Sequence, residues 1–310
     1  MPLKPIAISL GDPAGIGGEV AAKALLKRPA IMKRAWIFGD PRCVPERYRR
    51  RLAKAHWTYC LAPKWRMGRP CAYSGHAAFH SVTEAAKACL SGEAAALVTA
   101  PLSKEALQLG GHQFPGHTEI LAKLAGLRPQ QVGMLLVGGG LRVFLVTRHL
   151  ALRDALKALN TKALREALGL CEQGLRDTFK VRRPRLALAA LNPHAGEGGV
   201  LGTEEKALLE PFVRRYQDQR RFQLSGPLPA DTVFVQALRG QFDAVLCLYH
   251  DQALIPLKLL AFESGVNVTL GLPFVRTSPD HGTAYDIAGK NKAHPGSMLA
   301  ALDLAVKLGR

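Results

Sequence analysis

The sequence is poor in the features that mark exported, membrane-spanning and zinc-finger proteins. No apolar run approaches the ~18 residues that a membrane-spanning helix needs, and the apolar stretch at residues 6–10 is too short for the core of a signal peptide. The six cysteines include no C-x-x-C pair, which excludes zinc-finger and thioredoxin-type sites. We therefore expect a soluble, cytoplasmic protein with no membrane partner, whose cysteines are reduced thiols, several of them buried.

Acidic residues are also scarce. The 310 residues carry 42 Lys and Arg against 24 Asp and Glu, a formal net charge of +18. The densest basic clusters, Arg47–Arg51 and Arg214–Arg221, are short and contain one aromatic residue each. A nucleic-acid surface combines basic and aromatic side chains more extensively. We therefore expect no nucleic-acid partner, and interpret the charge as a solvated surface plus a site for anionic substrates.

The composition that remains, 48% hydrophobic and 21% charged, is that of a globular protein. Short apolar segments alternate with helical stretches. Strands are expected at residues 6–10, 36–39, 95–99, 141–147, 185–191, 244–249 and 266–270, and helices at 17–27, 77–90, 118–125, 152–171, 204–215, 232–240, 252–262 and 296–308. Because the strands are apolar almost without interruption, the pattern predicts an α/β fold with parallel strands covered on both faces.

Polar residues follow several of these strands, where open α/β sheets bind their ligands. His149, His194 and His250 each follow a different expected strand, with Glu197 and Asp251 beside two of them. Taken singly, each is more readily an ordinary loop or core histidine. Taken together, three imidazoles are candidates for a catalytic site holding a divalent metal ion.

Further candidates lie in other loops. Gly15 and Gly17 open a helix after the first strand, but Val20 occupies the third glycine position of a dinucleotide fingerprint, so this motif is weak. His117 and Thr118 stand at a helix N-terminus. Lys258, Asn267 and Arg276, the last expected in a loop, are candidates for binding a phosphate or carboxylate. Asp231 is either a helix N-cap or a functional carboxylate.

Six segments, in order along nearly the whole chain, resemble the 4-hydroxythreonine-4-phosphate dehydrogenase family of pyridoxal phosphate biosynthesis. They are Gly11-Asp-Pro-Ala-Gly-Ile-Gly17, Gly116-His-Thr-Glu119, Leu191-Asn-Pro-His-Ala-Gly-Glu-Gly198, Gly226-Pro-Leu-Pro-Ala-Asp-Thr232, Tyr249-His-Asp-Gln252 and residues 267–283. Residues 41–75 show no such likeness by eye. The resemblance implies an isocitrate/isopropylmalate-dehydrogenase-like fold of two α/β/α domains with a cleft between them. We place the first domain at residues 1–116 plus 285–310, and the second at 117–284.

The resemblance also implies a homodimer with a shared active site and a metal-dependent, NAD-linked oxidation. The substrate would be 4-phosphooxy-L-threonine, oxidised to a β-keto acid that decarboxylates to 3-amino-2-oxopropyl phosphate. One divalent ion, zinc, cobalt, manganese or magnesium, would be held by His149, His194 and His250, one of them from the partner chain. His117, Thr118, Lys258, Asn267 and Arg276 would bind the substrate. The general base stays open among Lys258, Asp231 and a hydroxide on the metal.

The cofactor site is implied in the same way. Residues 281–290 resemble the adenosine loop of isopropylmalate dehydrogenases, which assigns His281, Gly282, Thr283, Asp286 and His294 to cofactor binding together with Gly15 and Gly17. Asp286 would accept a hydrogen bond from the ribose 2′-hydroxyl and repel a 2′-phosphate, which favours NAD over NADP. His294 replaces the Asn of those dehydrogenases, and Gly18 replaces an expected Pro.

Three alternatives to this function stay open on the sequence. One is a paralogous dehydrogenase of a 4-phosphorylated sugar acid, such as erythronate or threonate 4-phosphate. Another is a non-redox, phosphate-binding transferase, which would have no use for the histidines or Asp286. The third is a basic nucleic-acid-binding protein, which steeply salt-dependent binding to a duplex would reveal.

Overall fold

The computed structural model describes residues 3–309, which divide into two compact units. The first contains the chain up to Val132 and from Glu263 onward, and the second contains Gly133–Phe262. Residues 117–132 and 263–284, which the sequence-based division placed in the second domain, therefore cluster with the first unit. Residues 263–284 belong there because the strands β10 (Val266–Leu270) and β11 (Val275–Pro279) pair within the sheet of that unit. Residues 117–132 belong there because Ile120 and Leu121 pack in the same core cluster as Ala7 and Val82.

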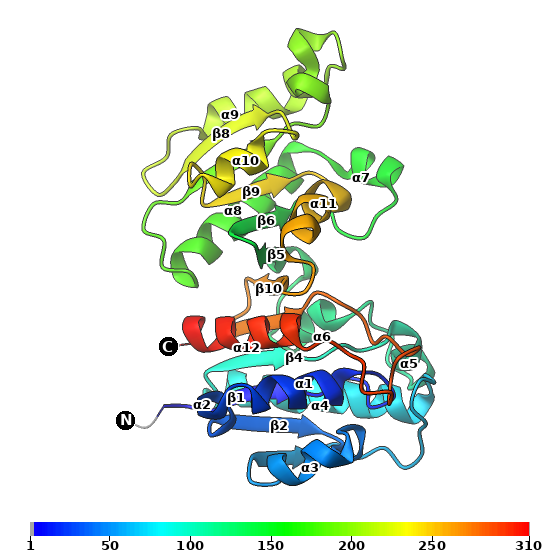
Figure 1. Ribbon diagram of the computed structural model, residues 1–310. Helices are drawn as coiled ribbons and strands as arrows, with labels where there is room; N and C mark the ends of the chain where they lie inside the picture. The colour runs from blue at the N-terminus through cyan, green and yellow to red at the C-terminus, as the bar shows by residue number, and fades with distance from the viewer. Residues whose placement is uncertain (1–2, 310) are drawn as a thin grey trace. The chain divides into compact units, whose positions relative to one another are not determined.

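The first unit is built on a six-stranded sheet with the order β3-β2-β1-β4-β11-β10 (Figure 1). The strands are β1 (Ile6–Ser9), β2 (Ala35–Gly39), β3 (His56–Tyr59), β4 (Ala96–Thr99), β10 (Val266–Leu270) and β11 (Val275–Pro279). Strands β3, β2, β1, β4 and β11 run parallel, and β10 runs antiparallel to β11. The central strands are buried at every position, as expected for a sheet covered on both faces.

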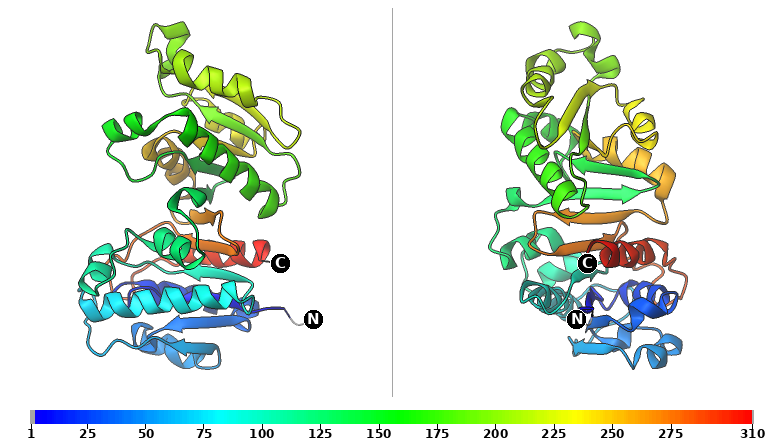
Figure 2. Two further views of the ribbon diagram at one scale, coloured as in Figure 1. Left: turned by 180° about the vertical axis from the view of Figure 1, so that it is seen from behind. Right: turned by 90° about the vertical axis from the view of Figure 1, so that its left-hand side faces the viewer.

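Helices cover both faces of this sheet. They are α1 (Gly17–Leu26), α2 (Pro29–Met32), α3 (Glu46–Leu52), α4 (Ala72–Leu90), α5 (Lys104–Leu109), α6 (His117–Leu124) and α12 (Gly296–Leu308), with 3-10 turns η1 (Pro41–Cys43) and η2 (Pro129–Gln131). Figure 2 shows α1 and α12 on one face and α4 on the other. The long helix α4 begins with a capping box, in which the Cys71 thiol accepts from Ser74 N and the Ser74 hydroxyl accepts from Cys71 N.

The second unit has a five-stranded sheet with the order β5-β6-β9-β7-β8. The strands are β5 (Gly133–Gly138), β6 (Leu141–Leu145), β7 (Arg185–Ala189), β8 (Gln223–Leu228) and β9 (Ala244–Cys247). Its helices are α7 (Leu152–Ala158), α8 (Thr161–Asp177), α9 (Glu210–Tyr216), α10 (Val233–Leu238) and α11 (His250–Ala261), with the 3-10 segment η3 (Pro193–Gly199) and the π-helical segment η4 (Glu205–Leu209). Helix α8 covers one face, and α10 and α11 cover the other (Figure 2).

The expectation of an α/β fold is confirmed, but the expectation of parallel strands alone is wrong. Each sheet contains one antiparallel pair, β10–β11 and β5–β6. The hairpin β5–β6 turns at Gly139 and Gly140, which both have positive φ, 57° and 87°. Glycine adopts this left-handed region without steric cost, and a two-residue loop of this kind joins antiparallel strands.

The helix expected over residues 152–171 is two helices. Helix α7 ends before Asn160, and α8 begins after it. The Asn160 side chain accepts a hydrogen bond of 3.0 Å from Ala163 N, so it is the N-cap of α8. Strands β3, β5, β8 and β11 and helices α2, α3 and α5 are additional to the elements expected from the sequence.

Two other expectations concern the cysteines and membrane-spanning helices. All six cysteines are free and five are buried, which confirms the expectation of unpaired, mostly buried thiols. Burial raises the pKa of the Cys60 thiol to about 11. Among residues 3–309, no helix combines the length and apolarity that crossing a membrane would require.

Two helix-interior glycines provide a matched test of packing between α4 and α5. A Cβ on Gly75 would lie 1.7 Å from the Ala106 carbonyl oxygen, whereas a Cβ on Gly169, within α8, would meet nothing within 4 Å. Gly75→Ala should therefore destabilise the chain by about 1–3 kcal/mol through overpacking, and Gly169→Ala should stabilise it by about 0.5–1 kcal/mol through helix propensity. Urea unfolding followed by circular dichroism measures both, and equal effects would contradict the close contact.

Candidate active site

The three candidate metal ligands follow three neighbouring strands of the second unit. His149 comes after β6, His250 after β9 and His194 after β7. These strands lie next to one another in the order β6-β9-β7 and run parallel. The expectation that each histidine follows a separate strand is therefore confirmed, and the three loops leave the same edge of one sheet.

His149 and His250 lie close together. Their ring centroids are 5.5 Å apart, and the ring planes are inclined by 45°. His250 is the first residue of α11, and its Nδ1 lies 2.7 Å from Asp251 Oδ1. Because an ionised carboxylate only accepts, this contact places the proton on Nδ1 and leaves the Nε2 lone pair for a metal ion.

His194 lies in an exposed turn with an uncommon backbone. His194, Ala195 and Glu197 have φ of 51°, 55° and 41°, and the glycines between and after them, Gly196 and Gly198, are also left-handed. Each non-glycine residue in this region costs about 1–2 kcal/mol relative to the right-handed conformation. Such strain is retained where the surrounding structure imposes it, and it concentrates at functional sites.

The buried carboxylate of Glu205 holds this turn in place through hydrogen bonds. Glu205 is 1% exposed, and its Oε1 accepts from Leu191 N at 2.9 Å and from Asn192 N at 2.8 Å. Its Oε2 accepts from Asn192 Nδ2 at 2.8 Å and faces the α-carbon of Gly196 closely enough that a Cβ there would lie 2.8 Å away. One buried carboxylate therefore fixes both the start and the middle of the loop that carries His194.

Within residues 3–309, no three His, Cys, Asp or Glu side chains gather closely enough to hold a metal ion by themselves. A single chain brings His149 and His250 together without adding His194 to the pair. The metal assignment stays a prediction, with the third ligand expected from a second copy of the chain.

The first unit contains a buried guanidinium that makes no ion pair within 4.0 Å among the described residues, although the charge of Glu119 acts on it from farther away. Arg276 is 2% exposed and lies in β11, not in the loop where the sequence placed it, and its neighbour across the antiparallel pair is Thr269. Its Nη2 and Nε donate to Thr99 Oγ1 at 2.6 and 3.2 Å, and its Nη1 donates to Thr269 Oγ1 at 2.9 Å. Burial lowers the pKa of Arg276 to about 10, so the group still carries its charge at neutral pH.

Two further candidate substrate residues of this unit have buried polar atoms without a hydrogen-bond partner, His117 Nε2 and Asn267 Oδ1. His117 is the first residue of α6, after the N-cap Gly116, so the helix start expected there is confirmed. Burial, followed by the positive charge of Arg276, holds the pKa of His117 well below its ordinary value, and the ring is neutral. A buried cation and two unsatisfied polar atoms constitute a set of groups suited to an anionic, hydroxylated ligand.

The remaining candidates differ in surroundings. Thr118 follows His117 in α6. Lys258 lies on α11 with His250, and its Nζ is 5.4 Å from the centroid of the Phe262 ring. Asp231 is exposed, and the expected N-cap role is wrong, because Thr232 is the N-cap of α10.

The two glycines assigned to the cofactor are required by contacts within the protein. A Cβ on Gly17 would lie 2.1 Å from the Leu10 carbonyl oxygen, and a Cβ on Gly15 would lie 2.9 Å from Thr283. Ile16 N also donates to the Thr283 carbonyl at 3.0 Å. The structure therefore joins the turn after β1 to the loop at 281–286, which the sequence suggested only by assigning both to one cofactor.

A hydrogen bond between Asp12 and Tyr285 strengthens this junction. The Tyr285 hydroxyl donates to Asp12 Oδ2 at 2.5 Å, and Ala14 N donates to Asp12 Oδ1 at 2.8 Å. Burial raises the pKa of Asp12 despite these bonds. Beside this pair, the exposed Asp286 carboxylate has no hydrogen bond or ion pair among the described residues, so it is accessible to a ligand hydroxyl.

The other assigned cofactor residues belong to the same segment. His281 Nδ1 lies 3.1 Å from the Gly282 carbonyl oxygen, and His294 Nδ1 accepts from Gly296 N at 3.3 Å. His294 Nε2 lies 3.7 Å from Glu263 Oε2. The structure thus provides contacts within the protein for both ring nitrogens of His294, the residue that replaces the Asn of isopropylmalate dehydrogenases.

Sequence reasoning missed the residues that hold these groups in place. Thr99 and Thr269 orient Arg276, Glu205 fixes the loop of His194, and Tyr285 anchors Asp12. Thr269 and Tyr285 lie inside two segments that carried the resemblance, residues 267–283 and 281–290, but no role was assigned to them. The roles of Thr99 and Glu205 depend on contacts between residues apart in the chain.

Comparisons with known proteins identify the family of the chain. The family model described as pyridoxal phosphate biosynthetic protein PdxA matches residues 23–305. The 4-hydroxythreonine-4-phosphate dehydrogenase of Caulobacter vibrioides is 44% identical, covering 99% of this chain and 98% of its own. That of Geobacter metallireducens is 43% identical, covering 98% and 95%.

Solved structures give the same result. The crystal structure of 4-hydroxythreonine-4-phosphate dehydrogenase from Klebsiella pneumoniae superposes with a TM-score of 0.87 at 37% identity, covering 99% of this chain and all of the other. Sequence and fold agree over nearly the full length of both proteins. The chain therefore belongs to the PdxA family of pyridoxal phosphate biosynthetic proteins, whose named relatives are dehydrogenases.

Proposed function

We propose that this chain oxidises 4-phosphooxy-L-threonine in an NAD-linked, metal-dependent reaction. The secondary alcohol loses a hydride to NAD and a proton to a base, which gives a β-keto acid. Loss of carbon dioxide from that acid gives 3-amino-2-oxopropyl phosphate. The names of the relatives support the substrate, and the chemistry of the candidate residues supports its recognition.

The observation that carries this proposal is the buried charge of Arg276. A guanidinium that is 2% exposed and hydrogen-bonded only to threonine hydroxyls is incompletely compensated among the described residues, because Glu119 acts on it through charge without forming an ion pair. A phosphate or carboxylate of the substrate would supply the missing negative charge through charge-assisted, bidentate hydrogen bonds. His117 Nε2 and Asn267 Oδ1 would bond polar groups of the same substrate, and Thr118 would add a hydroxyl at the N-terminus of α6.

His149 and His250 are suited to hold a divalent ion, because their rings adjoin and Asp251 orients one of them. His194 from a partner subunit would complete the set in a homodimer. Asp286, with its unpartnered carboxylate, would accept from the ribose diol of NAD. When bound, the metal supplies Lewis acidity toward the alcohol and the keto acid, and NAD supplies the hydride acceptor.

The base that accepts the proton of the alcohol is assigned to Lys258 or Asp231. Lys258 is partly buried on the helix that His250 opens, whereas Asp231 is exposed beside the N-cap of α10. A lysine base must be neutral to accept the proton. Comparing Lys258→Met with Asp231→Asn would separate the two, because only the variant that lacks the base should lose the acidic limb of the pH–rate profile, where protonation of the base limits the rate.

A substrate panel tests the activity itself. Purified chain with NAD and a divalent metal is given 4-phosphooxy-L-threonine, erythronate 4-phosphate or threonate 4-phosphate, and NADH formation is followed by absorbance. We expect 4-phosphooxy-L-threonine to give the highest kcat/KM and to release one carbon dioxide per NADH. Preference for either sugar acid, or no NADH with any of them, would overturn the assignment.

Arg276→Met should separate recognition from stability. Methionine fills much of the same volume and removes a buried cation that lacks a carboxylate, so the melting temperature should hold or rise, as in other buried-charge replacements. The kcat/KM should fall by at least about 100-fold, because a charge-assisted, bidentate contact is lost. Arg28→Met, at a partly exposed arginine paired with Asp303, is the control and should leave kcat/KM unchanged. Unfolding of the Arg276 variant would instead make the guanidinium structural.

His194→Ala tests whether this histidine binds a metal ion that turnover requires. Alanine also has a Cβ, so the backbone cost of the left-handed turn is unchanged and the fold should persist by circular dichroism. Metal content per chain and metal-dependent turnover should both fall, the latter by at least about 100-fold. His80→Ala, at an exposed histidine of α4, is the control. Full turnover of the His194 variant after chelation would refute the metal assignment.

A further inference from the structure

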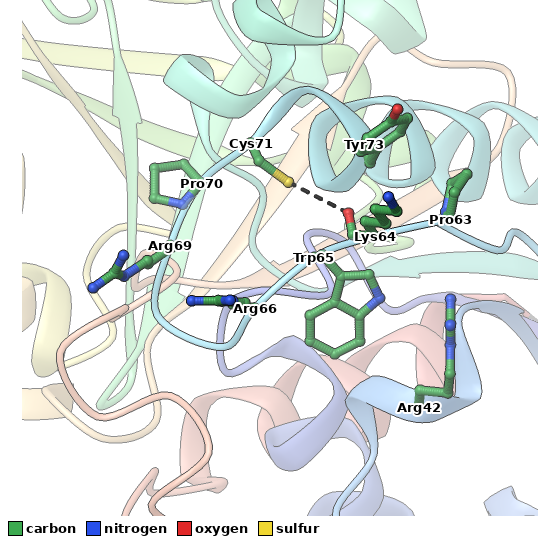
Figure 3. A pocket seen from close by; sticks show the side chains of 9 residues that line it. All are labelled: Arg42, Pro63, Lys64, Trp65, Arg66, Arg69, Pro70, Cys71 and Tyr73. Atoms are coloured by element: carbon green, nitrogen blue, oxygen red, sulfur yellow. Dashed lines mark hydrogen bonds between the residues drawn. The ribbon is translucent and has the colours of Figure 1, made fainter.

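A cavity of about 770 Å³ lies in the first unit, in the stretch of sequence that shows no family likeness by eye. It is formed by the loop between β3 and α4 together with η1 (Figure 3). Four cationic side chains line it, Arg42, Lys64, Arg66 and Arg69, along with Trp65 and Tyr73. The volume is within the range of small-molecule sites in proteins.

The positive charge of this cavity is largely uncompensated. Arg42 is paired with the buried Asp40 carboxylate, at 2.6 Å. The side chains of Lys64, Arg66 and Arg69 make no hydrogen bond or ion pair among residues 3–309. Three free cations around one hollow select an anion with several charged oxygens, because guanidinium and ammonium groups both bind phosphate.

Trp65 gives the cavity a flat apolar surface in a fixed position. Its Nε1 donates to Asp40 Oδ2 at 3.3 Å, and Asp40 also accepts from Ala62 N at 3.2 Å, so the edge of the indole is anchored. In the view of Figure 3 the Trp65 ring lies between the side chains of Arg66 and Arg42. Two prolines and Tyr73 add further apolar wall. Stacking on such a ring is a general way of binding a nucleobase.

The same loop adjoins the segments assigned to the cofactor. Gly68 N donates to the Ala14 carbonyl at 2.8 Å, and a Cβ on Gly68 would lie 2.8 Å from the Tyr285 carbonyl oxygen. Met67 contacts the position of Gly289, where a Cβ would lie 3.2 Å from Met67 Cγ. The turn that carries Arg66 and Arg69 is therefore packed against the loop that contains Asp286.

We propose that this cavity binds a phosphorylated purine nucleoside, with the base on Trp65 and the phosphate among Lys64, Arg66 and Arg69. The ligand is an adenine nucleotide bound beside the cofactor. It is not the 2′-phosphate end of a dinucleotide, which the neighbouring Asp286 would repel.

Intrinsic fluorescence tests the proposal without relying on turnover. Adenosine 2′,5′-bisphosphate and ADP are titrated into the full chain, with adenosine as the uncharged control. We expect saturable quenching by the nucleotides but not by adenosine, and loss of the signal in Trp65→Phe. The double variant R66E/R69E should weaken binding at least about ten-fold, because two charge-assisted contacts are reversed. R50E, at an exposed arginine of α3 outside the cavity, is the matched control and should bind normally.

Competition with the dinucleotides tests whether this site is separate from the cofactor. We expect undiminished nucleotide binding in saturating NAD, and displacement of the nucleotide by NAD or NADP would overturn the proposal. Absence of quenching by every nucleotide, or equal weakening by R66E/R69E and R50E, would overturn the proposal. Either result leaves the NADH assay of the proposed dehydrogenase unaffected, so the two ideas fail independently.

Discussion

The burial of Arg276 is the constraint on which the first unit depends. A cation inside a protein is unfavourable unless it is paired and hydrogen-bonded, yet this guanidinium is bonded to Thr99 and Thr269 alone. Those hydroxyls come from β4 and β10, the two strands on either side of β11. The sheet order therefore brings three polar side chains together inside the sheet, where no carboxylate of residues 3–309 is hydrogen-bonded to the guanidinium.

The second unit contains a different unfavourable feature, which is backbone strain. His149 and His194 both have left-handed backbones, at φ of 47° and 51°. In the loop of His194 the cost is met by the buried Glu205 carboxylate, which accepts three hydrogen bonds from the chain around it. In both units, the unfavourable features, a buried cation and left-handed residues, lie at residues assigned to substrate or metal binding. Functional sites commonly contain such departures from the preferred local structure.

Much of the fold was predictable because buried parallel strands are read from short apolar runs. All seven expected strands exist, and the histidines follow three of them. Hairpins were not predictable in the same way: β5 and β11 each pair antiparallel with a neighbour, and β11 contains the polar run Arg276-Thr-Ser278, which resembles a loop. The break between α7 and α8 was not predictable either, because the helical pattern of the sequence continues across it. The N-cap hydrogen bond of Asn160 becomes evident only in the structure.

The site was predictable in its residue types but not in its contacts. Residue spacing placed His149 and His250 after separate strands, whereas only the strand order of the sheet shows that their rings adjoin. The basic loop at 61–71 gave no motif, since its meaning depends on η1, on Ala14 and on the loop of Tyr285, all distant in sequence. Contacts between residues so far apart in the chain produce no repeating pattern in a single sequence.

The interrupted path of the chain through the first unit has a consequence for biosynthesis. During translation the second unit possesses its last strand once Cys247 has emerged, and its residues are continuous from 133 to 262. The first unit begins earlier but lacks β11, the strand between β4 and β10, until Pro279, and lacks α12 until Leu308. Although domains usually fold in the order of synthesis, here the half that leaves the ribosome first is the last to close, and the nascent chain presents the unfilled edge of β4 throughout that interval.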